Sequence, residues 1–432
     1  GLPFWPLDAL FGHVRAWNLF LLLSYLAAGG FAYLWLRELA LPVAAAAFGG
    51  LVFALEPYRV AQSAGHLRGP VSVLLPLALW ALERGRRGSP WWYAGAAAAL
   101  ASIPFSDVHL ALGASPFFLL YALCRRAWAG SLAVVPAVLA GVVVGHFSTS
   151  GIGSGGRSLR EVARYSASGL DLVTRHPRHG LESFVFLGWL TPLLALAGLV
   201  ALRRRRGLAV LLGLAAVVPC LLALGGNLPG YEAVWRAVPG LESTRVPERL
   251  MPIACLAIAA LAAFGVDAAL TTLGVNHHRL VAPAVVAAVV VVLALDLRVP
   301  VFGAVAADEP NAAYAAIRGD GRLLELPVFR PDLHYGSVYL GYARQSPRER
   351  PQGYSTLAPP AAERLARELR GLSCGRGEIP AGLGIRFVAV HRGLYEQSGF
   401  FGPGCADRAE AMLRADGWRL LARDGRIATY AR

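Results

Sequence analysis

Long apolar segments with few charged residues recur through the first two thirds of the 432-residue chain. A helix needs about 20 apolar residues, within a range of about 17 to 25, to cross the hydrocarbon core of a bilayer. Charged residues make up 16% of the chain, against about 25% in typical soluble proteins. The sequence therefore predicts a mainly α protein, a polytopic transmembrane helix bundle. About ten spans are expected, several of them short: residues 16–36, 39–55, 69–82, 90–105, 108–124, 128–147, 183–202, 207–225, 250–270 and 280–295.

Arginines mark one side of this predicted bundle. They cluster on alternate connections, and short cytoplasmic loops carry an excess of basic residues, so these connections are predicted to face the cytoplasm. The arginines are Arg37, Arg84, Arg86, Arg87, Arg125, Arg126, Arg203, Arg204, Arg205, Arg206 and Arg279. Loops 56–68, 106–108, 148–182 and 226–249 are then expected to face outward, with everything after residue 295. Because the chain begins at Gly1 rather than Met, we also expect an upstream segment.

The sequence changes character after residue 297, where charged residues become frequent and long apolar runs stop. "RLLELPVF" and "GIRFVAVHR" are typical of buried strands, "PPAAERLARELRGL" and "CADRAEAMLRADG" of amphipathic helices, and "WRLLARDGRIATYAR" of a hairpin turning at Asp424 and Gly425. We expect a transmembrane domain at 1–297 and a smaller extracytoplasmic α/β domain at 298–432. Cys374 and Cys405 lie in that domain, and either a disulfide or two free buried thiols fits the sequence.

The net charge of +14 does not indicate a nucleic-acid partner. All 41 basic residues are arginines, which a GC-rich genome explains, and they are scattered, with no block larger than residues 203–206. "GIGSGG" lacks the lysine and the strand–turn–helix setting of a phosphate loop. The sequence has no zinc-ligand spacing and no nucleophile elbow in a suitable context, so no metal ligands are predicted.

The predicted outward loops hold an unusual share of the polar residues. In "EPYRVAQSAGHLRG", five polar residues lie close to the predicted membrane surface: Glu56, Tyr58, Arg59, His66 and Arg68. In "PFSDVHL", Asp107 and His109 interrupt two apolar runs. An ionised carboxylate at such a depth costs roughly 2.5 to 3.5 kcal/mol. Asp107 is therefore expected to face a watery cavity or a partner, with a helix cap as the alternative.

The two longer outward loops supply further candidates. "SLREVARYSASGLDLV" predicts an amphipathic helix along the outer membrane face. Its arginines either extend toward lipid phosphates or bind the phosphate of one lipid substrate, because guanidinium forks match phosphate oxygens. The candidate binding residues in this loop are Arg157, Arg160, Glu161 and Tyr165. In "LESTRVPERLM", Arg245 and Arg249 are candidates, and a surface ion-pair network with Glu242 and Glu248 is the alternative.

The pattern resembles the bacterial multi-pass membrane glycosyltransferases of the C superfamily (GT-C), in particular inner-membrane members with a soluble C-terminal domain. The resemblance rests on "PLDALFG", "AWNLFLLLSYLAAGGFAYLWLRELAL", "FALEPYRVAQSAGHL", "RSLREVARYSA", "ESFVFLGWLTPLLALAGLVAL" and "PGLESTRVPERLMPIACLAIAALAAFGV". In the C-terminal third, "LLELPV", "PQGYSTLAPP" and "LGIRFVAVHR" fit the same group. These motifs cover nearly the whole chain, although each is loose.

The resemblance implies a polyprenyl-phosphate-linked sugar donor and transfer at the outer face of the membrane. In that superfamily an acidic residue of the first outward loop acts as base, basic residues hold the lipid phosphate, and some members need a divalent metal ion. Asp8 stands at the end of the corresponding loop, whose preceding part is largely absent here, and Asp107 and Glu56 are the other acidic candidates. The division of roles is chemically reasonable, because the base removes a proton while the phosphate leaving group needs charge stabilisation.

The leading hypothesis from the sequence is a multi-pass glycosyltransferase of the inner (plasma) membrane. It transfers a sugar from the lipid-linked donor to a glycan, lipid or protein acceptor of the cell envelope. The alternative is a non-catalytic envelope membrane protein, such as a flippase, a transporter or a glycan-binding scaffold. A transporter should carry internal repeats with paired broken helices, and no convincing repeat is visible in the sequence.

Overall fold

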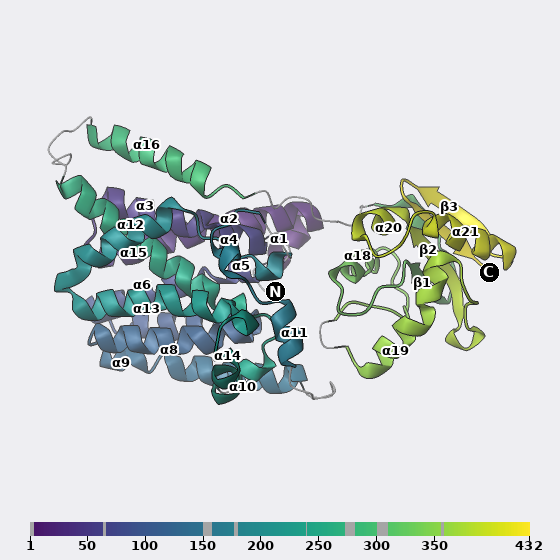
Figure 1. Cartoon of the computed structure of the whole chain (residues 1–432), viewed down its shortest axis with the longest axis horizontal. Helices are drawn as coiled ribbons and strands as arrows, with labels where there is room; N and C mark the ends of the chain where they lie inside the picture. Colours follow the sequence, from purple (N-terminus) through teal and green to yellow (C-terminus); the bar gives the residue numbers. More distant parts are fainter. Residues whose placement is uncertain are drawn as a thin grey trace. The chain divides into compact units, whose positions relative to one another are not determined.

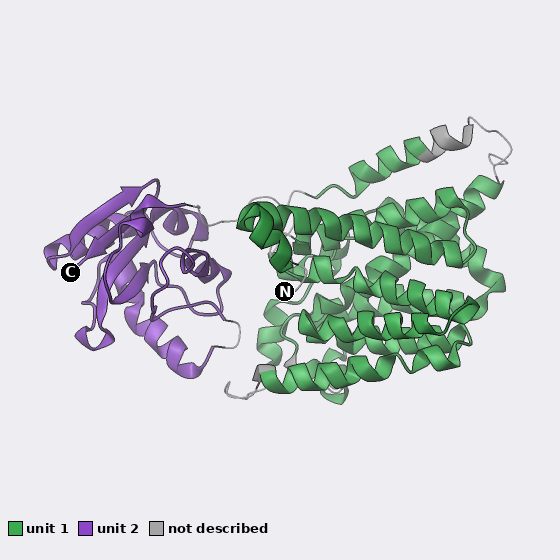
Figure 2. Ribbon diagram, turned by 180° about the vertical axis from the view of Figure 1, so that it is seen from behind, with its two compact units in different colours: residues 1–148, 155–302 green, residues 149–154, 303–432 purple. Residues whose placement is uncertain are grey.

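The computed structural model describes residues 4–63, 66–149, 158–176, 180–238, 240–272, 281–299, 310–355 and 358–432. The chain divides into two compact units (Figure 2). Unit 1 comprises residues 1–148 and 155–302, and unit 2 comprises residues 149–154 and 303–432. Unit 1 is helical, and unit 2 combines helices with a four-stranded sheet.

The long helices of unit 1 lie roughly along one direction (Figure 1). Each of the ten apolar segments expected from the sequence overlaps a helix. The α-helices are α1 Phe4–Phe11, α2 His13–Glu38, α3 Val43–Leu55, α4 Pro57–Ser63, α5 Arg68–Val71, α6 Leu74–Arg87, α7 Trp91–Ser102, α8 Val108–Cys124, α9 Trp128–Ser131, α10 Val134–Thr149, α11 Leu159–Arg164, α12 Leu190–Ala201, α13 Arg206–Ala223, α14 Tyr231–Ala237, α15 Met251–Thr272 and α16 Val281–Asp296.

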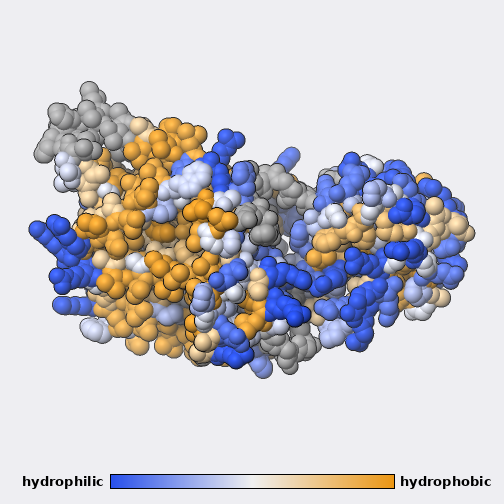
Figure 3. All heavy atoms as spheres, viewed as in Figure 1, coloured by the Kyte–Doolittle hydropathy of each residue, from blue (hydrophilic) through white to orange (hydrophobic). Residues whose placement is uncertain are grey.

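The described part of the chain holds four helices that are long and apolar enough to cross a membrane, or five if α3 and α4 form one bent span. The four run over His13–Glu38, Trp128–Phe147, Arg206–Ala223 and Pro247–Thr272. Apolar side chains cover much of the visible face of unit 1 (Figure 3). Leu139, Val142 and Leu193 are among the exposed ones. The chain is thus a mainly α membrane protein, and the number of ten spans stays a prediction.

Helix α15 forms the centre of unit 1. Every residue from Met251 to Val266 is buried. Helix α12 crosses α15 at a pair of glycines. A Cβ atom on Gly198 would lie 1.7 Å from the carbonyl oxygen of Leu261, and one on Gly265 would lie 2.2 Å from that of Leu194. Two glycines therefore let the backbones touch, as small residues do in membrane helix pairs.

A bend of 41° separates α3 from α4. It falls at Glu56 and Pro57, because proline lacks a backbone N–H and disfavours the helical conformation of the residue before it. The guanidinium of Arg59, which is 2% exposed, occupies the inside of this region. Its Nη1 donates to the carbonyl oxygen of Ala54, its Nη2 to that of Ser24 and its Nε to Ser72 Oγ, all at 2.9 Å. The bond to Ala54 pairs a carbonyl group at the end of α3, where the helix is interrupted.

Polar contacts join several connections between helices at one end of unit 1. Arg84 at the end of α6 lies 3.6 Å from Glu38 at the end of α2. Arg205, between α12 and α13, donates to the carbonyl oxygen of Leu39 at 3.1 Å. The connections that carry Arg37, Arg84 and the 203–206 arginines therefore share one end, as the arginine distribution predicts.

The continuous amphipathic helix expected over residues 158–173 is wrong. Helix α11 covers only Leu159–Arg164, and a 3₁₀ turn follows at Gly169–Leu172. Tertiary hydrogen bonds interrupt the helix, because the Ala167 N–H donates to the carbonyl oxygen of Ala223 at 2.9 Å. Ser166 Oγ also accepts from the Gly226 N–H at 2.9 Å.

Unit 2 contains a sheet with strand order β1-β2-β4-β3. Strands β1 and β2 are parallel, while the β2–β4 and β4–β3 pairs are antiparallel. The strands are β1 Arg322–Leu326, β2 Ile385–His391, β3 Arg419–Asp424 and β4 Ile427–Ala431. The α-helices of this unit are α17 Ala312–Ala315, α18 Ser337–Tyr342, α19 Pro360–Leu369, α20 Arg392–Ser398 and α21 Cys405–Ala415. The predicted strands, amphipathic helices and closing hairpin are confirmed.

The two faces of the sheet pack against different helices. Leu324 and Val388 belong to a core with residues of α19 and α21. Their neighbours Leu323 and Phe387 belong to a second core with residues of α17 and α18. This alternation follows from the two-residue period of a strand. Cys374 and Cys405 form a disulfide, so the disulfide alternative is confirmed.

A buried polar network lies under β1 and β2. Glu325 Oε2 accepts a hydrogen bond from the Tyr314 hydroxyl at 2.6 Å and lies 3.0 Å from His391 Nε2. Its other oxygen pairs with Arg350 Nε at 2.8 Å. Although burial favours the neutral acid, hydrogen bonding and charge from His391 and Arg350 outweigh it and hold the pKa of Glu325 below its ordinary value.

Candidate functional site

Three arginines and two carboxylates from separate loops meet at the end of unit 1 opposite Arg84. The short helices α4, α5, α11 and α14 lie at this end (Figure 1). We call the residues Tyr58, Arg68, Asp107, Glu248 and Arg249 the arginine–carboxylate cluster, and Arg245 lies in the same loop as its last two members. The cluster thus combines a residue of α4, one of α5, the start of α8 and the turn that precedes α15.

Asp107 both caps a helix and forms an ion pair. Its Oδ1 accepts from the backbone N–H groups of His109 and Leu110 in the first turn of α8, both at 3.0 Å. Its Oδ2 lies 3.0 Å from Arg68 Nε. The partner and the cap expected from the sequence are therefore combined in one side chain. Burial alone would raise the pKa of Asp107, but the positive charges of Arg68 and Arg249 outweigh it and lower that pKa below its ordinary value.

Glu248 is the most deeply buried carboxylate of the cluster, with no exposed surface. Its Oε1 accepts a hydrogen bond from Arg68 Nη1, and its backbone carbonyl accepts one from the Tyr58 hydroxyl at 3.1 Å. Its Oε2 has no hydrogen-bond partner among the described residues. Arg68 thus bridges Asp107 and Glu248, and one carboxylate oxygen keeps its full capacity to accept.

Arg249 is the partly accessible cation of the cluster, with 23% of its side chain exposed. Its Nη1 lies 2.7 Å from His109 Nδ1 and 3.9 Å from Asp107 Oδ1. Because guanidinium only donates, the His109 Nδ1 accepts, which places any ring proton on Nε2. Its Nε has no partner in the part of the chain that the structure describes. This Nε is itself buried, so Arg249 keeps one unpaired donor inside the cluster.

Arg245 is held by a different loop. Its Nη2 lies 3.0 Å from Glu182 Oε1, and its guanidinium stacks on the Tyr165 ring at 4.3 Å. Its Nη1 donates to the Tyr165 hydroxyl at 3.3 Å. Its Nε, too, lacks a hydrogen-bond partner among the described residues. Among the described residues, Arg245 pairs with Glu182 and Arg249 lies near Asp107, and no ion pair joins either arginine to Glu242 or Glu248. The described residues therefore do not form the ion-pair network within this loop that was the alternative from the sequence.

Two of the acidic candidates lie outside the cluster. Glu56 sits at the bend between α3 and α4 and is fully buried. Neither of its carboxyl oxygens has a hydrogen-bond partner among residues that the structure describes. Asp8, on α1, lies with its Oδ1 3.2 Å from His13 Nδ1. A catalytic role for Glu56 or Asp8 stays a prediction.

The remaining candidates are distributed along the loops that were predicted to face outward. His66 Nδ1 lies 2.7 Å from Gln62 Oε1. Arg160 is exposed on α11, and the backbone N–H of Glu161 donates to the capping Ser158 at 3.2 Å. Arg157 lies outside the described residues.

The sequence-based list missed Arg68, Glu248 and Glu182 as members of the site. Arg68 stands in the same polar loop as Tyr58, and Glu248 was considered only as a surface partner. Their contacts are far apart in sequence, since Arg68 and Glu248 are separated by 180 residues and Arg245 and Glu182 by 63. The one signal in the sequence was the presence of an arginine and two glutamates in loops predicted to share a side.

No protein-family model matches the chain, and no curated protein matches it. Among solved structures, the cryo-EM structure of the arabinofuranosyltransferase AftD from Mycobacteria matches with a TM-score of 0.63 and 19% sequence identity. The match covers 99% of this chain and 34% of AftD. The chain shares the fold of the matched part of AftD. It spans about a third of the length of that protein, and the resemblance to GT-C membrane glycosyltransferases is confirmed at the level of the fold.

Proposed function

We propose that the chain acts as a membrane glycosyltransferase that takes a sugar from a polyprenyl-phosphate donor and transfers it to a cell-envelope acceptor. The observation that carries this proposal is the convergence of Arg68, Arg245 and Arg249 at one end of a membrane helix bundle. Two of the three have a guanidinium Nε without a partner among the described residues. Phosphate oxygens are the ligands that such donors match in geometry and charge.

In this proposal Arg249 and Arg245 bind the donor phosphate from two sides. Charge builds up on the phosphate as the glycosidic bond breaks, and fixed cations in a site with little water stabilise that charge. Asp107 stays ionised, since its pKa is lowered, and holds Arg68 and Arg249 in position. Tyr165 and Glu182 do the same for Arg245. Asp107, Tyr165 and Glu182 are positioning residues for the phosphate site.

The residues present do not fit a divalent metal ion at this site. Such ions need several oxygen ligands, but Asp107 spends one oxygen on the α8 backbone and the other on Arg68. In the described parts of the chain no group of three His, Cys, Asp or Glu side chains is placed to hold a metal. We therefore assign the stabilisation of the leaving phosphate to the arginines.

The proposal includes the predicted orientation, with about ten spans and with the arginine–carboxylate cluster and unit 2 on the outer side of the inner membrane. The Cys374–Cys405 disulfide supports this side for unit 2, because disulfides persist in oxidising compartments and are rare in the cytosol. The transfer experiment described next identifies the donor sugar and the class of acceptor, which is a glycan, a lipid or a protein.

Binding and transfer are tested separately on the purified protein in detergent. Native mass spectrometry with a C55 polyprenyl phosphate measures the binding of the phosphate lipid. We expect Arg249→Ala and Arg245→Ala to weaken binding roughly 10- to 150-fold each, as expected for a charge-assisted hydrogen bond of about 1.5 to 3 kcal/mol. Transfer from polyprenyl-phosphate-linked pentose and hexose donors to envelope glycan should fall in parallel.

The matched control is Arg236→Ala. Arg236 is an exposed arginine of the same outward loop and pairs with Glu232 on α14. It should bind and transfer as the unchanged protein does. Equal lipid binding by Arg249→Ala, Arg245→Ala and Arg236→Ala would show that the arginines do not form a phosphate site.

A further inference from the structure

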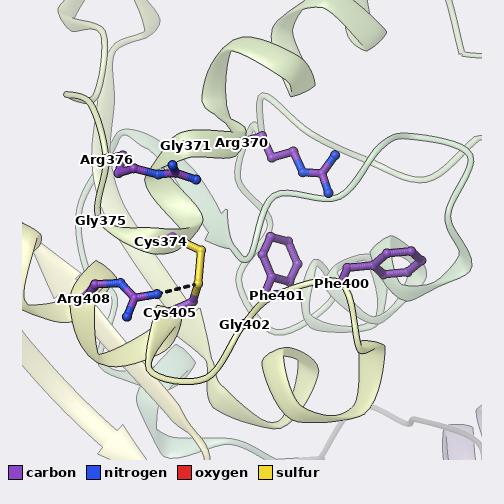
Figure 4. A pocket seen from close by; sticks show the side chains of 10 residues that line it. All are labelled: Arg370, Gly371, Cys374, Gly375, Arg376, Phe400, Phe401, Gly402, Cys405 and Arg408. Atoms are coloured by element: carbon purple, nitrogen blue, oxygen red, sulfur yellow. Dashed lines mark hydrogen bonds between the residues drawn. A yellow bond between two sulfur atoms is a disulfide. The ribbon is translucent and has the colours of Figure 1, made fainter.

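A basic cavity of about 740 Å³ lies in unit 2, far in sequence from the arginine–carboxylate cluster (Figure 4). Sites for small molecules commonly have volumes of about 300 to 1,000 Å³. The cavity is lined by three arginines, Arg370, Arg376 and Arg408, and by two phenylalanines, Phe400 and Phe401. In Figure 4, Arg376 and Arg408 lie to one side of the disulfide, and Arg370 lies on the side of the phenylalanines.

The charge around this cavity is uncompensated. None of its lining residues is acidic. Arg370, Arg376 and Arg408 are exposed, and none of the three forms an ion pair with a residue that the structure describes. The first residue of α21, Cys405, also lines the cavity, so the positive end of an eleven-residue helix opens on it. Several positive groups around one concave surface attract anions.

The disulfide keeps these arginines together. Cys374 lies between Arg370 and Arg376 in the chain, and Cys405 lies one helical turn before Arg408. The bridge therefore joins the two segments that carry the cations. Arg408 Nη2 lies 3.1 Å from Cys405 Sγ, so that side chain is directed toward the bridge. A ligand meets cations that are already assembled, which lowers the entropy cost of binding.

The phenylalanines add an apolar wall. Phe400 is 46% exposed, and its ring packs against Phe329 and Tyr335 with centroid distances of 6.5 and 6.1 Å. Phe401 packs against Tyr395 at 5.4 Å. The rings are thus held from behind while Phe400 presents part of its surface to solvent. A ligand that fits this wall has an apolar ring face beside its negative groups.

We propose that this cavity binds a saccharide that carries carboxylate or phosphate groups. The guanidinium groups bind the oxyanions, and the C–H face of a sugar ring packs on Phe400. The proposal does not depend on the transferase activity, because no residue of the arginine–carboxylate cluster takes part in it.

Binding is measured by isothermal titration calorimetry on the full chain in detergent. Trigalacturonate and glucose 6-phosphate are the two anionic probes, and maltotriose is the neutral one. We expect at least one anionic probe to bind at least 10-fold more tightly than maltotriose. Arg376→Gln and Arg408→Gln should each weaken that binding roughly 10-fold, in line with lost charge-assisted hydrogen bonds, and added salt should weaken it further.

Two further variants distinguish binding at this cavity from nonspecific attraction of anions to the arginines of unit 2. Arg364→Gln removes an exposed arginine of α19 that does not line the cavity, and it should leave binding unchanged. Gly402→Leu adds an uncharged side chain at a residue that lines the cavity, where a Cβ atom meets nothing within 4 Å, and it should weaken binding by reducing the space for the ligand.

The proposal is overturned if neither anionic probe binds more tightly than maltotriose. It is equally overturned if Arg364→Gln weakens binding as much as Arg376→Gln does, or if Gly402→Leu binds normally. If inorganic phosphate displaces the bound saccharide at the same concentration as the saccharide itself, the cavity is a simple anion site and the saccharide assignment is wrong.

Discussion

The contact between α12 and α15 predicts the effect of a glycine-to-alanine substitution on the stability of the protein. Whether the added methyl group stabilises or destabilises the fold depends on where it lies. Gly198→Ala adds a Cβ atom that would lie 1.7 Å from the carbonyl oxygen of Leu261, whereas real Cβ contacts are essentially never closer than 3.0 Å. The obstructing atom belongs to the backbone and cannot rotate away. The two helices must therefore move apart by about 1.3 Å.

That separation breaks contacts of the central helix. Overpacking a core in this way costs about 1 to 3 kcal/mol, and an immobile backbone oxygen favours the upper value. Alanine stabilises a helix by roughly 0.5 to 1 kcal/mol relative to glycine, which offsets part of the loss. We expect a net loss of about 2 kcal/mol in the free energy of unfolding.

The assay is thermal unfolding of the detergent-solubilised protein, followed by intrinsic tryptophan fluorescence. Gly30→Ala is the matched control, because Gly30 lies exposed within α2 and its Cβ atom would meet nothing within 4 Å. The same substitution should lower Tm at Gly198 and leave it unchanged or raise it at Gly30. If Gly198→Ala unfolds at the same temperature as Gly30→Ala, the close crossing of the two helices is refuted.

Three further predictions concern single groups. Asp107→Asn should retain the α8 cap, while Asp107→Ala should lose about 1 kcal/mol more stability in the same assay; equal Tm values would contradict the capping role. Cys374→Ala with Cys405→Ala opens a bridge of sequence separation 31 and should cost roughly 3.5 kcal/mol, seen as faster hydrogen exchange in α19 and α21 but not in α15. The lowered pKa of Glu325 stabilises unit 2 at pH values above the pKa of this group in the unfolded chain, so the hydrogen-exchange protection factors of β1 should fall as the pH drops below about 4. Glu325→Gln should have lower protection factors at pH 7 and lose this acid dependence.

Much of the fold follows from local pattern. The segment 108–124 was predicted from its apolar run and is helix α8, because Asp107 caps its start and Arg125 follows its end. The buried strands and the closing hairpin of unit 2 were also predicted, since short apolar runs and the Asp424–Gly425 turn are properties of neighbouring residues. These features depend on hydrogen bonds and side-chain periods within a few residues.

The candidate site followed less completely from the sequence, because its geometry depends on long-range pairing. Asp107, Tyr58 and Arg249 were candidate site residues, but Arg68, which joins Asp107 to the next carboxylate, was noted only as a polar residue of its loop. The role of Glu182 at Arg245 likewise arises only when two outward loops fold together. Tertiary contacts also overrode a local pattern at Ser166, where the expected interfacial helix stops.

Arg59 has a consequence for how the chain is inserted into a membrane. A guanidinium that entered the bilayer without partners would cost roughly 2.5 to 3.5 kcal/mol. Two of its acceptors, on Ser24 and Ala54, leave the ribosome before it, and the third, Ser72, follows 13 residues later. The segment from the start of α2 to Ser72 therefore contains all three hydrogen-bond acceptors that offset the free-energy cost of placing Arg59 in the bilayer. We expect the translocon to release this segment into lipid as one assembled unit rather than helix by helix.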